Sequence, residues 1–231
     1  MLEGQRVGVV IPALNEERSI ASVIADLPSC VDEVVLVDNG STDRTSERAR
    51  SAGAIVLHEP RRGYGYACLR GIDHLRARRA DIVVFIDGDY SDYPEDLSSL
   101  ISPVARDRAD FVIGSRMIGE REVGAMLPHA LFGNWLATAL IRIFWSYRFT
   151  DLGPFRAIRM ASLQQLQMRD CTYGWTVEMQ IKAAKHKLRC VEVPVRYRKR
   201  IGKSKITGTV SGTVKASAKI LYTIFRYALS S

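Results

Sequence analysis

The chain has 231 residues, of which 47% are hydrophobic, so it is long enough to bury an extensive core in one large domain. Lysine and arginine outnumber aspartate and glutamate by 33 to 25, and the net charge of +8 favours contact with phosphates, nucleic acid or an anionic membrane face. The four cysteines show no C-x-x-C spacing, which argues against a zinc site or a disulfide framework. We therefore expect reduced thiols in a cytoplasmic protein.

Alternating strand and helix patterns organise the first half of the chain. Mostly apolar runs predict strands at 7–11, 33–37, 54–57 and 82–86. Helical spacing and end signals predict helices at 20–27, 43–52 and 64–78. The run at 82–86 is wholly apolar, as expected of a strand that is buried on both faces of a parallel sheet. This alternation predicts a doubly wound α/β fold, with a mostly parallel sheet and helices on both of its faces.

The second half of the chain is less regular. Strands are predicted at 110–114 and 155–158, and helices at 129–145 and 176–185. Polar and apolar residues alternate over 191–197, and Pro194 places this strand at an edge of the sheet. A strongly basic segment at 196–205 precedes a final helix.

Two features bear on the location of the protein. The N-terminus runs into a strand pattern without a charged and then apolar leader, so no secretory signal is expected. The apolar stretches at 130–149 and 210–229 carry basic residues, which argues against membrane spans. The helices within them are amphipathic and either lie along a bilayer or pack against the sheet. We expect a cytoplasmic chain, at most in peripheral contact with the cytoplasmic face of a membrane.

Two carboxylates follow the buried strand at 82–86. Asp87 and Asp89 are separated only by Gly88, and the carboxyl ends of such strands are where ligands bind in doubly wound sheets. This pair can hold Mg²⁺ or Mn²⁺ while the ion keeps positions open for phosphate oxygens. The alternative is a pair of solvated loop aspartates, with Ser91 or Asp92 capping the helix that starts near 94.

Other segments provide candidate contacts to a nucleotide. Asp38, at the end of the second strand, can accept hydrogen bonds from a base or ribose, although 38–41 also has the composition of a turn and helix cap. Arg62 and Gly65 belong to a basic, glycine-containing segment near a helix N-terminus, which suits phosphate binding. The basic segment at 196–205 is either a second phosphate contact or a solvated loop.

Several short motifs occur in a fixed order: VIPALNEE at 10–17, VDNGSTD at 37–43, FIDGD at 85–89, PEDL at 94–97, GSR at 114–116 and VPV at 193–195. Together they resemble the family 2 glycosyltransferases with the GT-A fold, and most closely the dolichyl-phosphate mannose synthase branch. The resemblance covers nearly the whole chain. It implies a catalytic domain over 1–208, followed by an amphipathic helix over 209–231.

The resemblance also implies a reaction. A hexose would move, with inversion, from a nucleotide-diphosphate sugar of the GDP-mannose or UDP-glucose type to a polyprenyl or dolichyl phosphate, with Mg²⁺ or Mn²⁺ as cofactor. A lipid phosphate is already a nucleophile, so positioning and charge stabilisation are sufficient for catalysis. If the acceptor is instead a soluble or saccharide hydroxyl, a carboxylate must take its proton, and Asp151 and Glu178 are the candidates.

Carried over position by position, the resemblance implies these roles. The residues expected to line the nucleotide pocket are Pro12, Asn15, Glu16 and Asp38. Asp87 would contact ribose or metal-bound phosphate, Asp89 would ligate the metal, and Arg116 would face the sugar or the acceptor phosphate. The basic loop expected to close over a phosphate carries Arg198, Arg200, Lys203 and Lys205. Arg156 is a further candidate for substrate binding.

One departure and two rival functions remain open. Ser91 stands where the synthases typically carry a glutamine that completes the metal site, and Asp92 is a candidate replacement. His129 is either a phosphate contact or structural. A sugar-phosphate nucleotidyltransferase would need a glycine-rich loop where this chain has 12–16. A basic module that binds nucleic acid would have no need of Asp87 and Asp89, so we expect no nucleic-acid partner.

Overall fold

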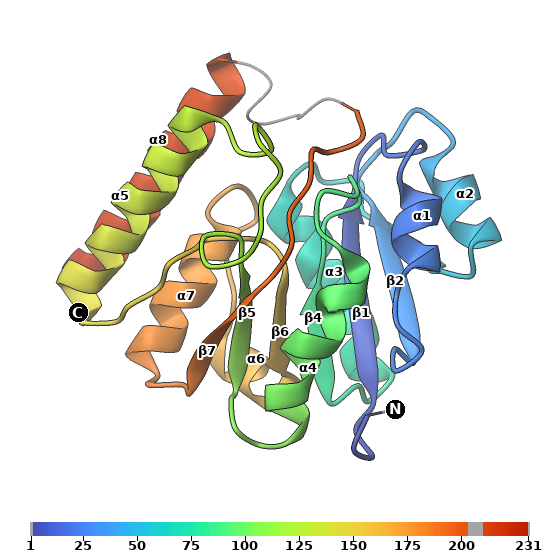
Figure 1. The fold of residues 1–231 in the computed structure, drawn as a ribbon, viewed down its shortest axis with the longest axis horizontal. Coiled ribbons are helices and arrows are strands. Elements are labelled where there is room, and N and C mark those ends of the chain that lie inside the picture. Colours follow the sequence, from blue (N-terminus) through green and yellow to red (C-terminus); the bar gives the residue numbers. More distant parts are fainter. Residues whose placement is uncertain (1, 203–209, 231) are drawn as a thin grey trace.

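The computed structural model describes residues 2–202 and 210–230, and these fold around one seven-stranded sheet (Figure 1). The strands are β1 (Val7–Ala13), β2 (Glu33–Asp38), β3 (Ile55–His58), β4 (Ile82–Phe85), β5 (Phe111–Ser115), β6 (Arg156–Arg159) and β7 (Cys190–Pro194). They lie in the order β3-β2-β1-β4-β6-β5-β7. Lys203 and Lys205, two residues of the predicted phosphate-binding loop, lie outside the described residues.

The helices follow the sequence patterns closely. They are α1 (Ile20–Ala25), α2 (Thr45–Ser51), α3 (Tyr64–Ala77), α4 (Leu97–Ala105), α5 (Pro128–Trp145), α6 (Met160–Leu166), α7 (Trp175–Lys185) and α8 (Val210–Leu229), and a 3-10 turn, η1 (Pro94–Asp96), precedes α4. Only α6 has no predicted counterpart among these helices, because its 7 residues span barely two turns and are too few for a helical period to be recognised.

Hydrophobic cores cover both faces of the sheet. Along β1, Val10 packs in the core that contains residues of α3, α5 and α7, whereas Val9 and Ile11 pack in the core formed with α1 and α4. Successive side chains of a strand point to opposite faces, so this apolar run supplies both cores. All four residues of β4 are buried. The prediction of a doubly wound α/β sheet is therefore confirmed.

Strand direction gathers the polar residues at one edge of the sheet. β1 pairs in parallel with β2 and β4, so the ends of these three strands point the same way. β6 is antiparallel to both β4 and β5, so β5 also ends at this edge and β6 begins there. β7 pairs only with β5, which confirms the predicted edge position. As a result, Asp38, Asp87, Arg116 and Arg156 all lie near one edge.

A layer of helices lies beyond the β5 and β7 end of the sheet. α8 packs against α5 and α7, and α5 also contacts α7 (Figure 1). Ile141 of α5 and Ile224 of α8 are fully buried in the same core. No helix within the described ranges has both the length and the apolar character needed to cross a membrane.

Candidate active site

Asp89 is held by partners on both of its carboxylate oxygens. The Ser91 hydroxyl donates to Oδ1 at 2.6 Å, and the Ser91 backbone N–H donates to the same oxygen at 3.0 Å. On the other side, Nη1 of Arg200 lies 2.7 Å from Oδ2. Ser91 therefore fixes the orientation of Asp89 and does not cap the following helix. Asp92 does not cap it either, because η1 has no side-chain cap bond.

Asp87 lies beside Asp89 in a setting that disfavours its charge. Burial, and then the neighbouring charge of Asp89, raise the pKa of Asp87 to about 7, although Arg200 and a hydrogen bond from Tyr64 act in the opposite direction. The Tyr64 hydroxyl lies 3.2 Å from Oδ1 of Asp87. Asp87 and Asp89 repel each other, and the guanidinium of Arg200 offsets this repulsion only in part. A divalent cation would relieve the rest.

The residues present fit Mg²⁺ or Mn²⁺ only as part of a complex with phosphate. Within 2–202 and 210–230, no three histidine, cysteine, aspartate or glutamate side chains form a cluster that could hold a metal ion. Mg²⁺ is commonly bound by one or two carboxylates, with phosphate oxygens and waters completing its shell. Asp87 and Asp89 can supply those carboxylates, and a diphosphate would supply the rest.

A cavity of about 540 Å³ opens along the ends of β1 and β4. The predicted site residues that line it are Pro12, Glu16, Arg62, Asp87, Asp89 and Arg200. Asn39, which the motif predicted only as a turn residue, also lines it and donates from Nδ2 to the carbonyl oxygens of Glu59 and Arg61 at 2.9 and 2.7 Å. We call this space the strand-end cavity.

Asn15 and Asp38 do not line the strand-end cavity. Oδ1 of Asn15 accepts the backbone N–H of Thr42 at 2.8 Å. Oδ1 of Asp38 accepts the N–H of Ser41 at 2.7 Å, and Oδ2 accepts the Ser46 hydroxyl at 2.5 Å. Burial opposes ionisation of Asp38, but these hydrogen bonds outweigh it and hold the pKa below its usual value. Asn15 therefore ties together the loops that follow β1 and β2, whereas Asp38 stabilises the segment that follows its own strand.

Arg198 and Arg156 are likewise engaged away from the cavities. Nε of Arg198 donates to the carbonyl of Tyr90 at 2.8 Å, and its guanidinium lies 3.4 Å from the centre of that ring. Arg156 is fully buried, and it donates to the carbonyls of Gly153 and Thr176, each at 3.1 Å. Burial lowers the pKa of Arg156 to about 10. The structure does not bring either side chain to a ligand-sized space.

Gly65 acts through close packing. A Cβ atom at this position would lie 2.0 Å from the carbonyl oxygen of Asp170, so only glycine lets α3 approach the loop after α6. The backbone N–H of Tyr66 donates to the carbonyl of Cys171 across this contact at 3.2 Å. The two residues after Cys171, Thr172 and Tyr173, line the strand-end cavity. Gly65 therefore positions a wall of the site.

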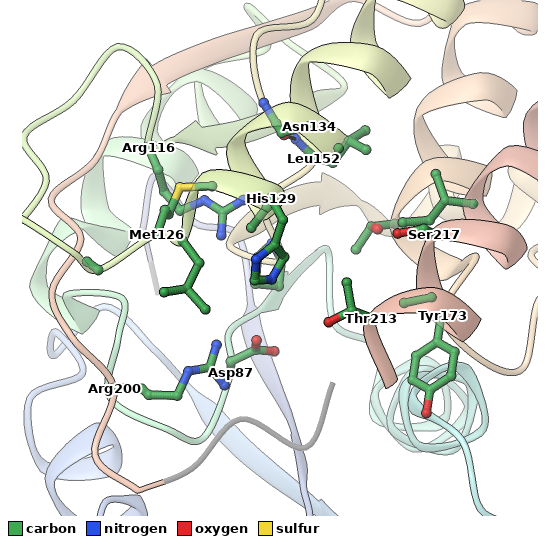
Figure 2. Close-up of a pocket in the computed structure, with 18 of the residues that line it drawn as sticks. Asp87, Arg116, Met126, His129, Asn134, Leu152, Tyr173, Arg200, Thr213 and Ser217 are labelled. Atoms are coloured by element: carbon green, nitrogen blue, oxygen red, sulfur yellow. Dashed lines mark hydrogen bonds between the residues drawn. The ribbon is translucent and has the colours of Figure 1, made fainter. Parts of the chain in front are cut away.

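A second cavity, of about 500 Å³, lies between the strand ends and the helices α5 and α8 (Figure 2). It shares with the strand-end cavity the residues Tyr64, Asp87, Thr172, Tyr173 and Arg200. The polar and basic residues that also line it include Arg116, His129 and Lys199, and the apolar ones include Leu127, Leu152, Trp175 and Ile220. We call this space the helix cavity. The sequence indicated Asp87, Arg116, His129 and Arg200 of these, and Lys199 as part of the basic segment, but it did not indicate the apolar walls as site residues.

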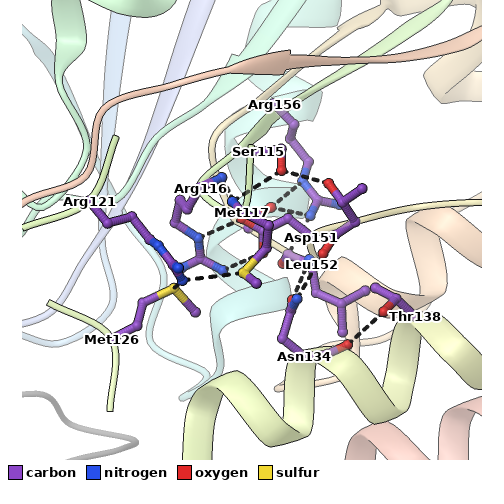
Figure 3. Close-up of polar contacts among 12 residues, drawn as sticks. Ser115, Arg116, Met117, Arg121, Met126, Asn134, Thr138, Asp151, Leu152 and Arg156 are labelled. Atoms are coloured by element: carbon purple, nitrogen blue, oxygen red, sulfur yellow. Dashed lines mark hydrogen bonds and ion pairs between the residues drawn. The ribbon is translucent and has the colours of Figure 1, made fainter. Parts of the chain in front are cut away.

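Arg116 is bound to a buried partner at the rim of the helix cavity (Figure 3). Its Nε and Nη2 lie 2.8 and 2.7 Å from the two oxygens of Asp151. Burial disfavours the charge of Asp151, but Arg116 outweighs it, so the pKa of Asp151 is lowered. This pair holds the guanidinium of Arg116 beside Asp87. The same guanidinium lies over the ring of Tyr197, 5.0 Å from its centre.

The two predicted candidates for a general base are wrong on geometry. Asp151 is fully buried and bound in two places by Arg116, and it lines neither cavity. Glu178 accepts the backbone N–H of Asp170 at 2.7 Å and pairs with Lys182 at 2.9 Å, and it also lines neither cavity. A base must reach the proton it takes, and the structure places neither carboxylate at a cavity that could hold an acceptor.

Asp92 is a buried acidic residue near the site whose carboxyl lacks hydrogen bonds. Neither of its oxygens has a hydrogen-bond partner among the described residues. Burial, and then the charge of Asp87, raise the pKa of Asp92 well above its usual value. It lines neither cavity. Burial without hydrogen bonds therefore disfavours a charge on Asp92.

Comparison with known proteins bears on this geometry. The sequence model of the family described as "Glycosyl transferase family 2" matches residues 8–167. An uncharacterized glycosyltransferase of Mycobacterium tuberculosis is 35% identical, covering 93% of this chain and 96% of that protein. The undecaprenyl-phosphate mannosyltransferase of Micrococcus luteus is 32% identical, covering 90% of each. The glucosyl-3-phosphoglycerate synthase of Mycobacterium tuberculosis, solved with Mn²⁺, UDP-glucose and phosphoglyceric acid, shares the fold with a TM-score of 0.77 at 24% identity, covering 97% of this chain and 80% of that one.

Substitution of Gly65 by alanine tests the close packing of α3. Gly65→Ala should reduce the free energy of unfolding by about 1–3 kcal/mol, because the added methyl meets backbone that cannot move aside cheaply. Urea unfolding measures the change. Gly133→Ala in α5 is the matched control, since a Cβ there meets nothing within 4 Å, and helix propensity should make it neutral or stabilising. Equal stability changes in both variants would contradict the packing role.

The pKa of Asp87 makes a prediction about pH. The folded-state pKa of about 7 exceeds the ordinary value of 3.8, so between these values the folded protein binds more protons than the unfolded chain. Without divalent metal, the wild type should therefore lose stability relative to Asp87→Asn as pH rises from about 4 to about 7, and no further above that. Urea unfolding across this range measures the difference. Asp73→Asn, which removes an exposed carboxylate of α3, is the control, and a flat difference for Asp87→Asn would disprove the crowding.

Proposed function

The chain belongs to glycosyl transferase family 2, and on that basis we propose that it moves a hexose from a nucleotide-diphosphate sugar to a polyprenyl phosphate, with inversion and with a divalent metal. Membership of this family overturns the nucleotidyltransferase alternative. The observation that carries the proposal is the meeting of two cavities at Asp87. One lies at the strand ends and is lined by Asp87, Asp89 and Arg62, and the other lies beside α5 and α8 and combines Arg116 and Lys199 with apolar walls.

The strand-end cavity suits the donor. Asp87 and Asp89 would hold Mg²⁺ or Mn²⁺ together with the diphosphate, and the ion takes up negative charge on that leaving group. Arg62 and Arg200 line the same space and can pair with phosphate oxygens. The solved neighbour that binds Mn²⁺ and UDP-glucose supports this assignment, as does the crowding of two carboxylates in the wall of the cavity.

The helix cavity suits an acceptor with a phosphate at one end and a hydrocarbon chain at the other. Its cationic end is formed by Arg116, Lys199 and Arg200, and the start of α5 adds the positive end of a helix dipole. Leu152, Trp175 and Ile220 give it apolar walls. The undecaprenyl-phosphate mannosyltransferase relative uses an acceptor of this chemistry, as its name states, which supports the proposal.

The proposed reaction needs no protein base. A phosphate oxygen, already negative at neutral pH, would attack the anomeric carbon at the wall shared by the two cavities while the bond to the diphosphate breaks. The configuration at that carbon inverts because the new bond forms opposite the leaving group. This agrees with the engagement of Asp151 and Glu178 in buried pairs, whereas a hydroxyl acceptor would require a free carboxylate.

Three finer assignments belong to this proposal. The chain is placed near the dolichyl-phosphate mannose synthase branch, at the cytoplasmic face of a membrane and in peripheral contact with it, because a polyprenyl acceptor is anchored there. The catalytic unit is placed at 1–208. The appended segment at 209–231 contributes to the same site, since Thr213, Ser217 and Ile220 of α8 line the helix cavity.

One assay tests the function directly. Purified protein is incubated with Mn²⁺ and a panel of uridine and guanosine diphosphate sugars, and nucleotide release is measured with and without polyprenyl phosphate. Release from at least one donor should depend on the acceptor. Release that is the same with polyprenyl phosphate, phosphoglycerate and no acceptor would contradict the proposal.

Asp89→Asn tests the metal site. This change should lower turnover by at least about 100-fold, because it removes a charge that holds the ion against the diphosphate. It should also abolish the effect of Mn²⁺ on nucleotide binding, measured by calorimetry. Asp73→Asn is the control for an equal change of charge at the surface. Wild-type turnover in Asp89→Asn would show that the metal role is misassigned.

His129→Ala tests the acceptor end of the helix cavity. Loss of this side chain should raise the KM for polyprenyl phosphate by about tenfold and leave the KM for the nucleotide sugar unchanged, because His129 lines only the helix cavity. Steady-state kinetics with each substrate varied in turn measures the split. His186→Ala, on the exposed end of α7, should change neither value. A change confined to the donor KM would reverse the assignment of the cavities.

A further inference from the structure

We propose that the outer faces of α5 and α8 form a single docking surface for an anionic lipid bilayer. The surface consists of Phe132, Trp135 and Ile143 on α5, and Val214, Tyr222 and Phe225 on α8. All six side chains are exposed, and the exposed fractions of Trp135 and Ile143 reach 61% and 71%. An exposed apolar area of this kind marks an interaction surface.

The apolar residues of α8 follow a helical stripe. Val214, Ala218, Leu221, Tyr222 and Phe225 are spaced at intervals that place them on one side of the helix. The buried side of α8 is separate and includes Thr223 and Ile224. The helix therefore has two apolar sides, one packed in the protein and one left to a partner.

The exposed sides of the two helices are continuous. The ring of Phe144 at the end of α5 meets the ring of Phe225 edge to face, with centroids 5.9 Å apart. Phe132 and Trp135 are also in contact, at 5.8 Å. The two helices lie together at one side of the molecule (Figure 1). A planar partner could therefore contact both at once.

The charge of the two helices indicates which kind of partner this surface binds. Neither 128–145 nor 210–229 contains an aspartate or a glutamate, whereas the two helices carry Arg142, Lys215, Lys219 and Arg226. Lys219 is paired with Asp170 at 2.8 Å, and the other three are exposed. Aromatic and aliphatic residues on two helices whose charged side chains are all cationic suit an anionic lipid surface. A second copy of the chain would bring two cationic faces together.

The opposite sides of these helices line the helix cavity. Ala130 and Gly133 of α5, and Ser217 and Ile220 of α8, belong to its walls. Docking on this surface would place the cavity beside the bilayer, so that the hydrocarbon tail of an acceptor need not leave the membrane. This last link rests on the proposed function, whereas binding of the surface to lipid does not.

Vesicle sedimentation without donor or acceptor tests the surface. Wild-type protein should sediment with phosphatidylglycerol vesicles and much less with phosphatidylcholine vesicles. The double variant Trp135→Ser with Phe225→Ser should partition at least about tenfold more weakly, and so should Lys215→Glu with Arg226→Glu. The matched controls are Ile55→Ser and Arg50→Glu, at exposed positions on β3 and α2, and they should bind as the wild type does.

Two results would overturn the proposal: equal binding by all variants, or no vesicle binding together with a dimer that the same substitutions dissociate. Circular dichroism confirms that each variant is folded. Transfer to a short, water-soluble polyprenyl phosphate separates this proposal from the proposed function. Vesicle binding without transfer would count against the function alone, and transfer without vesicle binding would count against the surface alone.

Discussion

Repulsion between two neighbouring carboxylates is the constraint on which the site depends. Asp87 and Asp89 follow the end of a buried strand, where Asp89 is buried and Asp87 is half-buried, and like charges interact strongly in such a setting. Arg200 offsets part of that repulsion through its contact with Asp89, and the pKa of the neighbouring Asp92 is raised by burial and by the charge of Asp87. A balance of this kind favours a divalent cation, whose charge would offset both the carboxylates and a diphosphate.

Much of the site could be predicted because its determinants are local in sequence. The apolar run before Asp87 identifies a buried strand, and parallel strands place the residues beyond their carboxyl ends at one edge of the sheet. Local motifs were less informative about side-chain roles. Asp38 and Arg198 lie in the expected loops, yet their polar atoms contact neighbouring backbone and rings. Polarity in a loop does not distinguish a residue that binds a ligand from one that shapes the loop.

The walls of the cavities could not be predicted, because they join segments far apart in the chain. Tyr64 and Tyr173 lie together only because Gly65 lets α3 approach the loop after α6. Arg116 and Asp151 meet across 35 positions, and that contact removes Asp151 from acid–base chemistry. No periodicity or spacing in the sequence indicates which distant residues meet in this way. Arg116 and Asp151 meet because β6 lies between β4 and β5. The sequence pattern predicted β6 as a strand but not its place in the sheet.

The two cavities are lined largely by different parts of the chain. Apart from Thr172, Tyr173 and Arg200, the strand-end cavity is lined by residues between 12 and 89, and apart from Tyr64 and Asp87, the helix cavity is lined by residues between 116 and 220. Recombination within this fold could therefore exchange one half while the other stays intact. Chimeric chains that combine the first half of this protein with the second half of a relative offer a direct route to altered acceptor choice, and natural lineages had the same route open to them.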